Sequence, residues 1–336
     1  MTADPGLEGR LAGRRIVVTG AHGAIGSHLV RRLAAAEAHV LCLDHAPGSP
    51  HGRPPAHVHT VRCDIRCPQL PDIISAHRPD TVIHLAAQVG VPASVAQPGY
   101  DADVNIRGTI AVAEATAAAG AKLVFAATCA IYGNPLRLPV TEDTSLAPIS
   151  PYGLSKTAAV QYLDWFATHH RLPVTTLILG NLYGTGTPNA VIDRFVAAAA
   201  SGTPTVLHGG GQPTRDFIHI NDVTDAFLTA CTAAPAGRIN IGSGTETSIR
   251  DVHHLITGLV PHTVPAQRRP ARPGDIPRMH LDVTRAATVL GWHARIDLAA
   301  GISALIHPLS ADRTHRPAAG RRPAVASPST RADGRP

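Results

Sequence analysis

Lysine and long apolar segments are both scarce in this chain. Only two of its 30 basic residues are lysines, Lys122 and Lys156. No apolar run is long enough to span a bilayer, which excludes a protein anchored by transmembrane helices. The first residues, MTADPGLEGR, contain no apolar leader segment. We therefore expect a cytoplasmic protein with no membrane partner.

Cysteine and metal-binding patterns are sparse as well. The chain has 5 cysteines, which in a cytoplasmic protein are expected to be free thiols rather than disulfides. Cys63 and Cys67 lack the spacing of a zinc finger, and the 20 histidines form no H-E-x-x-H or comparable pattern. The sequence therefore predicts no structural or catalytic metal.

Positive charge is concentrated at the C-terminal end. The formal net charge is +6, and the six Arg and two Asp after His307 account for +4 of it. The rest of the chain is close to neutral, so we expect no nucleic-acid partner. Residues 308–336 are rich in Pro, Ala, Gly, Ser and Arg, a composition that predicts a disordered tail. At the other end, residues 1–13 are expected to be an extension of the folded part.

Three glycines follow the first buried strand that the sequence predicts. Residues 16–18 are an apolar run typical of a parallel strand. Gly20, Gly23 and Gly26 come next, and a helical pattern begins near Ala24. In a dinucleotide site such glycines turn the chain, let the backbone approach a pyrophosphate and pack the helix on the strand. The phosphate oxygens accept hydrogen bonds from the helix N-terminus.

The next two predicted strands end in residues that suit a dinucleotide. Residues 39–43 lead into Asp44, 18 positions after the third glycine, where such a site places an acid on the adenosine ribose. This carboxylate would repel a 2′-phosphate, so the pattern favours NAD over NADP. Strand 81–85 leads into Ala86 and Ala87, whose small side chains leave room for the cofactor or pack against the first helix.

Strands and helices alternate along the first half of the chain. The expected strands are 16–18, 39–43, 58–63, 81–85, 122–127 and 174–179, and the strongest helical patterns are 102–119 and 152–170. This alternation predicts an α/β fold with a Rossmann-type doubly wound parallel sheet. We expect an NAD-binding domain at 14–180 and a smaller C-terminal substrate-binding lobe at 181–307, interleaved with the last strands of the sheet.

Tyr152 and Lys156 stand one helical turn apart on the same face of a predicted helix. An unperturbed tyrosine has a pKa of about 10 and is a poor base at neutral pH. A neighbouring ammonium and a positive nicotinamide ring favour the phenolate and are expected to lower that pKa. A surface Tyr–Lys pair is the alternative, but a chain that uses lysine only twice places one of the two here.

Thr128 follows strand 122–127, at the edge where open α/β sheets bind ligands. Its hydroxyl could bridge a substrate oxygen and the Tyr152 phenol. Thr128, Tyr152 and Lys156 together can move a proton to or from a carbinol oxygen beside NAD, so that a hydride can transfer.

A series of short motifs supports a family resemblance from about Arg14 to Ile306. They are TGAHGAIGSHL, Asp64-Ile65, HLAAQVGVPAS, Asn105 with Gly108-Thr109, TCAIYG, SPYGLSK, Asn181 to Gly184, RDFIHIND, NIGSG and RPGD. With these motifs in this order, the chain resembles the extended short-chain dehydrogenase/reductase family. The likeness is to its NAD-dependent nucleotide-sugar epimerases and dehydratases, of the UDP-glucose 4-epimerase type.

The resemblance implies how the cofactor is held. Ala24 and Ile25 would offer backbone N–H groups to the pyrophosphate, and Asp44 would contact the ribose. Asp64 and Ile65 would contact the adenine edge.

The resemblance also implies the catalytic and substrate residues. Thr128, Tyr152 and Lys156 take the catalytic roles argued above. The sugar nucleotide would be held by Asn181, Arg215 and Arg272, the two arginines through forked contacts with oxygens. Family analogy further implies a homodimer through the helices at 102–119 and 152–170.

Three positions depart from the family pattern. The 4,6-dehydratases have two carboxylates after the catalytic threonine, and this chain has Cys129 and Ala130 there. That favours epimerisation over 4,6-dehydration, although a Cys129 thiol could serve as proton donor in a 5,6-dehydration or simply line the pocket. Ile178 stands where the family often has Arg, which suggests an altered substrate lobe.

The sequence thus predicts an NAD-dependent 4-epimerase of a nucleotide-diphosphate sugar, with UDP-sugars favoured. The alternatives are an atypical dehydratase that uses Cys129 and a non-catalytic NAD-sensing protein on the same fold. A dehydrogenase that releases NADH is a further alternative.

Overall fold

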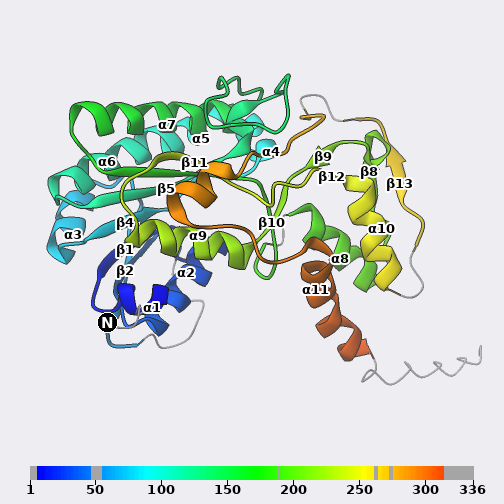
Figure 1. Ribbon diagram of the computed structural model, residues 1–336, viewed down its shortest axis with the longest axis horizontal. Helices are drawn as coiled ribbons and strands as arrows, with labels where there is room; N and C mark the ends of the chain where they lie inside the picture. The colour runs from blue at the N-terminus through cyan, green and yellow to red at the C-terminus, as the bar shows by residue number, and fades with distance from the viewer. Residues whose placement is uncertain (1–5, 47–54, 188–189, 261–263, 272–274, 314–336) are drawn as a thin grey trace, which may run out of the picture.

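Seven parallel strands form the centre of the computed structural model, which describes residues 6–46, 55–187, 190–260, 264–271 and 275–313 (Figure 1). Across the sheet they lie in the order β11, β6, β5, β4, β1, β2, β3. Their bounds are β1 Arg15–Thr19, β2 His39–Asp44, β3 Val58–Arg62, β4 Thr81–His84, β5 Lys122–Thr128, β6 Val174–Leu179 and β11 Gly237–Ile241. The expected Rossmann-type α/β fold is confirmed.

The strand order reverses at β1, which pairs with β2 on one side and with β4 on the other. Val17 at the middle of β1 lies opposite Leu41 of β2 and Val82 of β4. In open parallel sheets the connections diverge at such a point, which opens a crevice at the carboxyl ends of the strands. The glycine-rich turn after β1 and Ala86 after β4 both stand at this edge.

Helices cover both faces of the sheet (Figure 1). One face carries α3 (Leu70–His77), α6 (Gly108–Ala118) and α7 (Pro151–His169), and the other carries α1 (Gly6–Leu11), α2 (Ala24–Ala35) and α9 (Ile220–Thr232). Each layer has its own buried apolar cluster, because alternate side chains of a strand point to opposite faces of the sheet.

The segment around the helix expected over 102–119 is not one continuous α-helix. Short helices α4 (Val91–Ala96) and α5 (Pro98–Ala102) lead into a π-helical turn, Asp103–Arg107, and then into α6. Helix α6 has no single apolar face, because it packs against α3 and α7 at once. Its small residues, among them Val112 and Ala113, allow neighbours to approach from both flanks.

Helix α7 begins where the sequence predicts it. The Ser150 hydroxyl accepts a hydrogen bond of 3.1 Å from the Gly153 backbone N–H and caps the helix, and Pro151 fits the first turn because that position needs no N–H donor. Tyr152 and Lys156 therefore lie in the first turns of α7, beside the end of β5.

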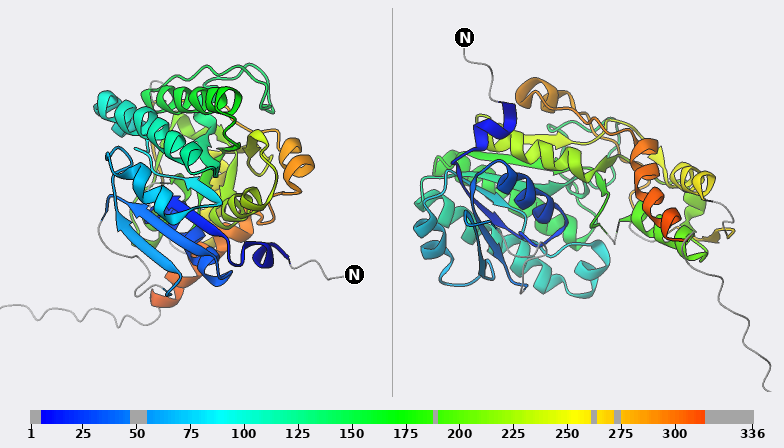
Figure 2. Two further views of the ribbon diagram at one scale, coloured as in Figure 1. Left: turned by 90° about the vertical axis from the view of Figure 1, so that its left-hand side faces the viewer. Right: turned by 90° about the horizontal axis from the view of Figure 1, so that it is seen from below.

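The second half of the chain forms a smaller lobe at one end of the sheet (Figure 2). Helices α8 (Val191–Ser201), α10 (Ile249–Leu259) and α11 (Leu298–Arg313) enclose a third apolar cluster. The lobe also has short strand pairs: β7 (Asn181–Tyr183) with β10 (Phe217–His219), β8 (Val206–His208) with β13 (Gln267–Arg269), and β9 (Thr214–Arg215) with β12 (Thr247–Ser248). Because β11 and α9 return to the sheet, the lobe is interleaved with it.

Helix α11 continues to Arg313, past residue 307, after which the sequence predicts a disordered tail. Residues 314–336 lie outside the described residues. Within the described ranges, no helix has the length and apolar character needed to cross a membrane. All five cysteines are free thiols, with the Cys63 and Cys67 Sγ atoms 3.0 Å apart.

Candidate active site

The turn between β1 and α2 leaves no room for side chains at two of its glycines. Gly20 has φ +69°, and a Cβ atom there would lie 2.7 Å from the backbone N of Ala86. A Cβ atom at Gly26 would collide with the carbonyl oxygen of Gly20. Gly23 is the N-cap of α2 and donates its N–H to the same oxygen over 3.1 Å. The turn is therefore as tight as the sequence pattern predicts.

Ala24 and Ile25 are the first two residues of α2. Their N–H groups have no intrahelical acceptor, because an α-helix leaves its first four donors unused. With the positive end of the helix dipole, these donors make the start of α2 suited to a phosphate group.

Asp44 is buried at the carboxyl end of β2, next to this turn. Its Oδ2 accepts a hydrogen bond of 2.9 Å from the backbone N–H of His22, and its Oδ1 accepts one of 2.9 Å from Ala46. The carboxylate thus ties the glycine-rich turn to β2. Each oxygen keeps a lone pair, so Asp44 can also accept from a ribose hydroxyl.

The Asp64 carboxylate is engaged with a neighbour. Arg66 donates to it from Nε and Nη2, over 2.9 and 2.5 Å, and also donates to Asp103 Oδ2. These hydrogen bonds hold the pKa of Asp64 well below its usual range, at about 2. Ile65 is buried beside it, and its side chain faces Gly108, where a Cβ atom would not fit. The sequence pattern did not indicate that Arg66 would form hydrogen bonds with the Asp64 carboxylate.

The small residues after β4 pack tightly against the glycine-rich turn. The Thr19 hydroxyl accepts from the Ala86 N–H over 3.2 Å and contacts His84 Nδ1 at 2.7 Å. Ala87, which follows, is half-buried. Of the two roles open to this alanine pair, the structure shows the packing role for Ala86.

Thr128, Tyr152 and Lys156 come together at the carboxyl edge of the sheet. Thr128 ends β5, and its side chain lies close enough to the phenol of Tyr152 to lower the pKa of that phenol against the larger effect of burial. Lys156 is only 3% exposed, and its Nζ stands 4.1 Å from the centre of the Phe125 ring. The three side chains that the sequence singled out are thus neighbours in space.

Burial determines the proton affinity of both titratable groups. It raises the pKa of Tyr152, and the nearby Cys129 and Asp101 add to this rise. It lowers the pKa of Lys156 to about 7, against the opposing effect of Asp101. In the chain alone, desolvation of the phenolate is the largest influence on the Tyr152 pKa. The expected lowering by the ammonium and the nicotinamide ring together stays a prediction.

Cys129 follows Thr128 and is buried beside Tyr152. Burial raises the pKa of its thiol to about 12, so the group is neutral at physiological pH. Ala130, the next residue, donates its N–H to the Thr128 hydroxyl over 3.3 Å. No carboxylate stands at either position.

The residues expected to hold the sugar nucleotide lie on the lobe side of this edge. Asn181 begins β7 and is half-buried. Arg215 in β9 donates from Nη1 to the carbonyl oxygens of Thr214 and Ile276, and its Nη2 is 3.9 Å from Asp275 Oδ1. Arg272 lies outside the described residues.

Ile178 is the last residue but one of β6 and is fully buried in the apolar cluster beneath α7. The suggestion that this departure marks an altered substrate lobe stays a prediction. The isoleucine is part of the core of the sheet.

Comparison with known proteins connects this geometry to a family. A family model described as "NAD dependent epimerase/dehydratase family" matches residues 16–242. The chain belongs to this family.

Individual relatives match almost the whole chain. A UDP-glucose 4-epimerase of Mycolicibacterium smegmatis is 37% identical over 86% of this chain and 96% of its own length. The crystal structure of the Thermotoga maritima UDP-glucose 4-epimerase with UDP-glucose has a TM-score of 0.84 at 31% identity, covering 89% of this chain and 99% of that one. The Thermus thermophilus UDP-glucose 4-epimerase, solved with NAD, has a TM-score of 0.80 at 31% identity, covering 88% and 99%.

NAD, the cofactor of the epimerase/dehydratase family, fits the residues present. Gly20 and Gly26 keep side chains out of the turn after β1, and Ala24 and Ile25 present free N–H groups there. Asp44 stands where it can accept from a ribose and would repel a 2′-phosphate.

A group of buried polar residues behind Tyr152 was missed by the sequence analysis. The Ser94 hydroxyl accepts from the Tyr152 N–H over 3.0 Å, and Asn105 Nδ2 lies 3.1 Å from Asp101 Oδ1 and 3.0 Å from Ser155 Oγ. Asn105 was noted only as part of a family motif. Asp101 was noticeable only as an acid directly before the helical pattern at 102–119, which by itself suggests a solvent-exposed position.

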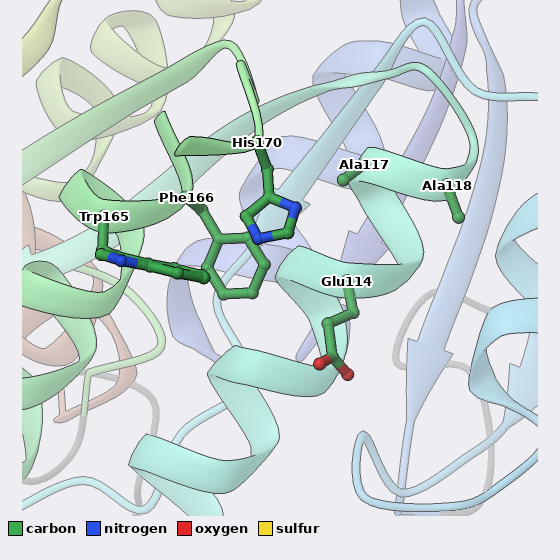
Figure 3. A pocket seen from close by; sticks show the side chains of 6 residues that line it. All are labelled: Glu114, Ala117, Ala118, Trp165, Phe166 and His170. Carbon is green, nitrogen blue, oxygen red and sulfur yellow. The ribbon is translucent and has the colours of Figure 1, made fainter. Parts of the chain in front are cut away.

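A surface pocket lies elsewhere, between α6 and α7 (Figure 3). The aromatic side chains of Trp165, Phe166 and His170 lie over Glu114, Ala117 and Ala118 of α6. Trp165 is 13 residues after Tyr152, about 20 Å along the helix, so this pocket is separate from the candidate active site.

Proposed function

We propose that this protein is an NAD-dependent 4-epimerase of UDP-sugars. The observation that carries the proposal is the meeting of Thr128, Tyr152 and Lys156 at the edge of the sheet that also holds the NAD cradle. The relatives that match almost the full length of the chain are named UDP-glucose 4-epimerases, which supports UDP as the nucleotide.

In the proposed reaction the Tyr152 oxygen takes the proton of the sugar 4-hydroxyl. The Thr128 hydroxyl, which lies near that phenol, helps to position the substrate oxygen. Lys156, one helical turn after Tyr152 on α7, supplies positive charge near the phenolate as it forms. NAD held by the turn after β1 and by Asp44 would supply the hydride acceptor for C4 and the hydride donor for the other face of the 4-keto sugar.

The protonation state of Tyr152 is expected to depend on whether the cofactor is bound. Burial keeps the Tyr152 phenol protonated in the chain alone, because it raises the pKa. A positive nicotinamide ring nearby favours the phenolate and counteracts this effect. We therefore infer that Tyr152 becomes a base when the oxidised cofactor is in place.

Cys129 supports epimerisation over dehydration. A 4,6-elimination of water needs an acid and a base beside the sugar, and the chain offers a neutral thiol and the methyl group of Ala130. An atypical elimination with Cys129 as proton donor remains the second candidate. It predicts a product lighter by one water.

The sugar nucleotide is proposed to contact Asn181, Arg215 and Arg272. Arg215 supports this role because its guanidinium is fixed by two carbonyl oxygens at the lobe side of the site. A fixed planar fork loses little conformational entropy when it binds phosphate or ribose oxygens.

We also propose a homodimer in which the exposed face of α7 meets a second copy. Leu154, Tyr162 and Trp165 are 58%, 44% and 46% exposed and fall on one side of this helix. Trp165→Glu would place a charge in such an interface, so light scattering should show monomers for this variant and dimers for the wild type.

The experiment that tests the proposed function uses UDP-glucose, UDP-galactose and their N-acetylated counterparts as substrates. We expect NMR to detect interconversion of each 4-epimer pair, with no net growth of NADH absorbance. Stoichiometric NADH would indicate a dehydrogenase instead, and absence of turnover across a broad panel of sugar nucleotides would favour the non-catalytic NAD-sensing alternative.

A further inference from the structure

Asp101 is a buried carboxylate that its surroundings do not fully satisfy. Its side chain is 1% exposed, on α5. Oδ1 accepts a hydrogen bond of 3.1 Å from Asn105 Nδ2, whereas Oδ2 is buried and has no hydrogen-bond partner among the described residues. Burial of an ionised carboxylate is costly unless an opposite charge compensates it.

Lys156 is the buried opposite charge on the helix against which the Asp101 helix packs. Helix α5 packs on α7, and Asp101 opposes the effect of burial on the Lys156 ammonium. The Lys156 Nζ also stands over the Phe125 ring, where the negative face of the ring favours a cation. The ammonium and the carboxylate are thus both buried, and the carboxylate favours the charged form of the lysine.

A hydrogen-bond network fixes the position of Asp101. Asn105 Nδ2 contacts Asp101 Oδ1, Ser155 Oγ and the carbonyl oxygen of Gln88, and Asn105 Oδ1 accepts from the Gln88 N–H over 2.8 Å. Ser155 precedes Lys156 and donates to the Tyr152 carbonyl oxygen over 3.1 Å. The network therefore links the carboxylate to the turn of α7 that carries both catalytic side chains.

Few other titratable groups face this pair. Tyr152 is on α7 itself, Cys129 comes from the turn after β5, and His84 comes from β4. Burial and the charge of Lys156 lower the pKa of His84 to about 3, and burial keeps Cys129 a neutral thiol. In the π-helical turn, Asp103 is paired with Arg66 and Arg107. The short helix α4, VPASVA, brings no titratable side chain.

We propose that Asp101 is a positioning residue of this site, whose buried carboxylate keeps the Lys156 side chain charged beside Tyr152. The proposal deepens the proposed function and rests on it for its catalytic consequence. The effect of Asp101 on Lys156 can be measured without any catalytic turnover. The role of Asp101 and the proposed epimerase function can therefore be refuted independently of each other.

The scarcity of lysine makes a direct test possible. Untagged protein labelled with ¹³Cε-lysine and carrying its bound NAD has two lysine signals, from Lys156 and Lys122. Lys122 donates to the carbonyl oxygens of Ala230 and Ala233 on the far side of the sheet and serves as an internal reference. The titration midpoint of Lys156 is read from its chemical shift against pH.

We expect Asp101→Asn to lower the midpoint of Lys156 by about one pH unit or more, a tenfold loss of proton affinity, because an opposite charge nearby shifts a pKa by that amount. Lys122 should not move. Asp101→Glu keeps the charge and should restore much of the wild-type midpoint. Asp103→Asn is the matched control, since it removes a neighbouring carboxylate that is paired with arginines, and it should leave Lys156 unchanged.

A Lys156 midpoint in folded Asp101→Asn within about 0.3 unit of the wild type, or an equal shift in Asp103→Asn, would overturn the proposal. If Asp101→Asn does not fold, Asp101→Ser takes its place in the same titration. The Tyr152 phenol is a poorer readout, because Asp101 also raises the Tyr152 pKa directly. Removing the Asp101 carboxylate lowers the Tyr152 pKa through this direct effect and raises it through the loss of charge on Lys156.

The catalytic consequence is read from the pH profile of epimerisation. We expect the alkaline limb of kcat in Asp101→Asn to move to lower pH by about one unit, with KM for the UDP-sugar unchanged, because the ammonium is lost earlier. A parallel loss of kcat at all pH values would indicate a merely structural role and contradict the proposal. A wild type without turnover would refute the proposed function, while the lysine titration would still decide the placement of Asp101.

Discussion

The sheet and the lobe of this protein are stabilised in different ways. Strands of the sheet are four to seven residues long and, apart from the exposed edge strand β3, are mostly buried, whereas those of the lobe are two or three residues long. In the lobe a buried carboxylate ties the segments together: Asp216 accepts from the backbone N–H groups of Ser243, Gly244 and Leu281. The sheet therefore depends mainly on apolar burial, and the lobe depends on specific polar contacts.

The sheet and the lobe also differ in their proposed roles in the reaction. The sheet edge carries the groups proposed to bind NAD and move the proton, and its geometry is fixed by backbone contacts such as that of Gly20 with Ala86. The lobe carries Arg215, which is held by carbonyl oxygens of neighbouring loops. Changes at the sheet edge should abolish chemistry or cofactor binding, and changes in the lobe should alter stability and substrate affinity.

The largest effect is expected from Tyr152→Phe, which removes the phenol and leaves the ring. We expect kcat to fall by about 10³-fold, because a general base contributes 10²–10⁴-fold. The thermal midpoint and NAD content should stay close to those of the wild type. Epimerisation assays and absorbance spectra measure these quantities, and a variant that keeps a tenth of the wild-type kcat would contradict the role of Tyr152.

Gly20→Ala should disrupt the cofactor cradle. Its Cβ atom would meet the Ala86 backbone at 2.7 Å in a residue with φ +69°, so we expect about 3 kcal/mol of strain and loss of bound NAD after purification. Gly120→Ala is the matched control, with φ +66° and no atom within 4 Å of the added Cβ. It should cost about 1 kcal/mol and retain NAD. Equal NAD loss in both variants would refute the close-approach argument.

Asp216→Ala tests the polar basis of the lobe. It leaves several buried N–H groups without their acceptor, so we expect urea unfolding to show a loss of about 3 kcal/mol and KM for the UDP-sugar to rise. Asp251→Asn, an exposed carboxylate at the start of α10, should cost about 0.5 kcal/mol. Similar losses in the two variants would contradict the view that buried carboxylates organise the lobe.

Arg66→Met should have the smallest effect, at the outer edge of the sheet. The Asp64 pKa is lowered by Arg66 to about 2, so this pair stabilises the fold above pH of about 4 and ceases to do so as the pH falls toward 2. Because Asp64 is partly exposed, we expect a thermal midpoint about 2 °C lower than the wild type at neutral pH. Calorimetry should find this difference vanishing near pH 2, and a difference that grows in acid would contradict the pairing.

The sequence predicted the sheet half well because its signals are local. Buried parallel strands appear as apolar runs such as residues 16–18, and Gly20, Gly23 and Gly26 allow only a tight turn. Thr128, Tyr152 and Lys156 were found because a strand end and one helical turn have fixed geometry. These patterns need no knowledge of distant contacts.

The features that the sequence did not predict share a physical cause. Each depends on contacts with residues that are far away in the sequence. Two-residue strands such as β9 and β12 form only against each other. The burial of Asp101 depends on the packing of α5 on α7, and the Tyr152 pKa depends on desolvation by the whole site.

The most direct test of the account is isotopic. UDP-glucose carrying deuterium at C4 should be incubated with the NAD-bound protein in ordinary water, and the product analysed by mass spectrometry and NMR. We predict a 4-epimer of unchanged mass that keeps deuterium at C4, because the same hydride leaves and returns within one site. A product lighter by one water would contradict transient C4 oxidation with hydride return and would make Cys129 the centre of an elimination.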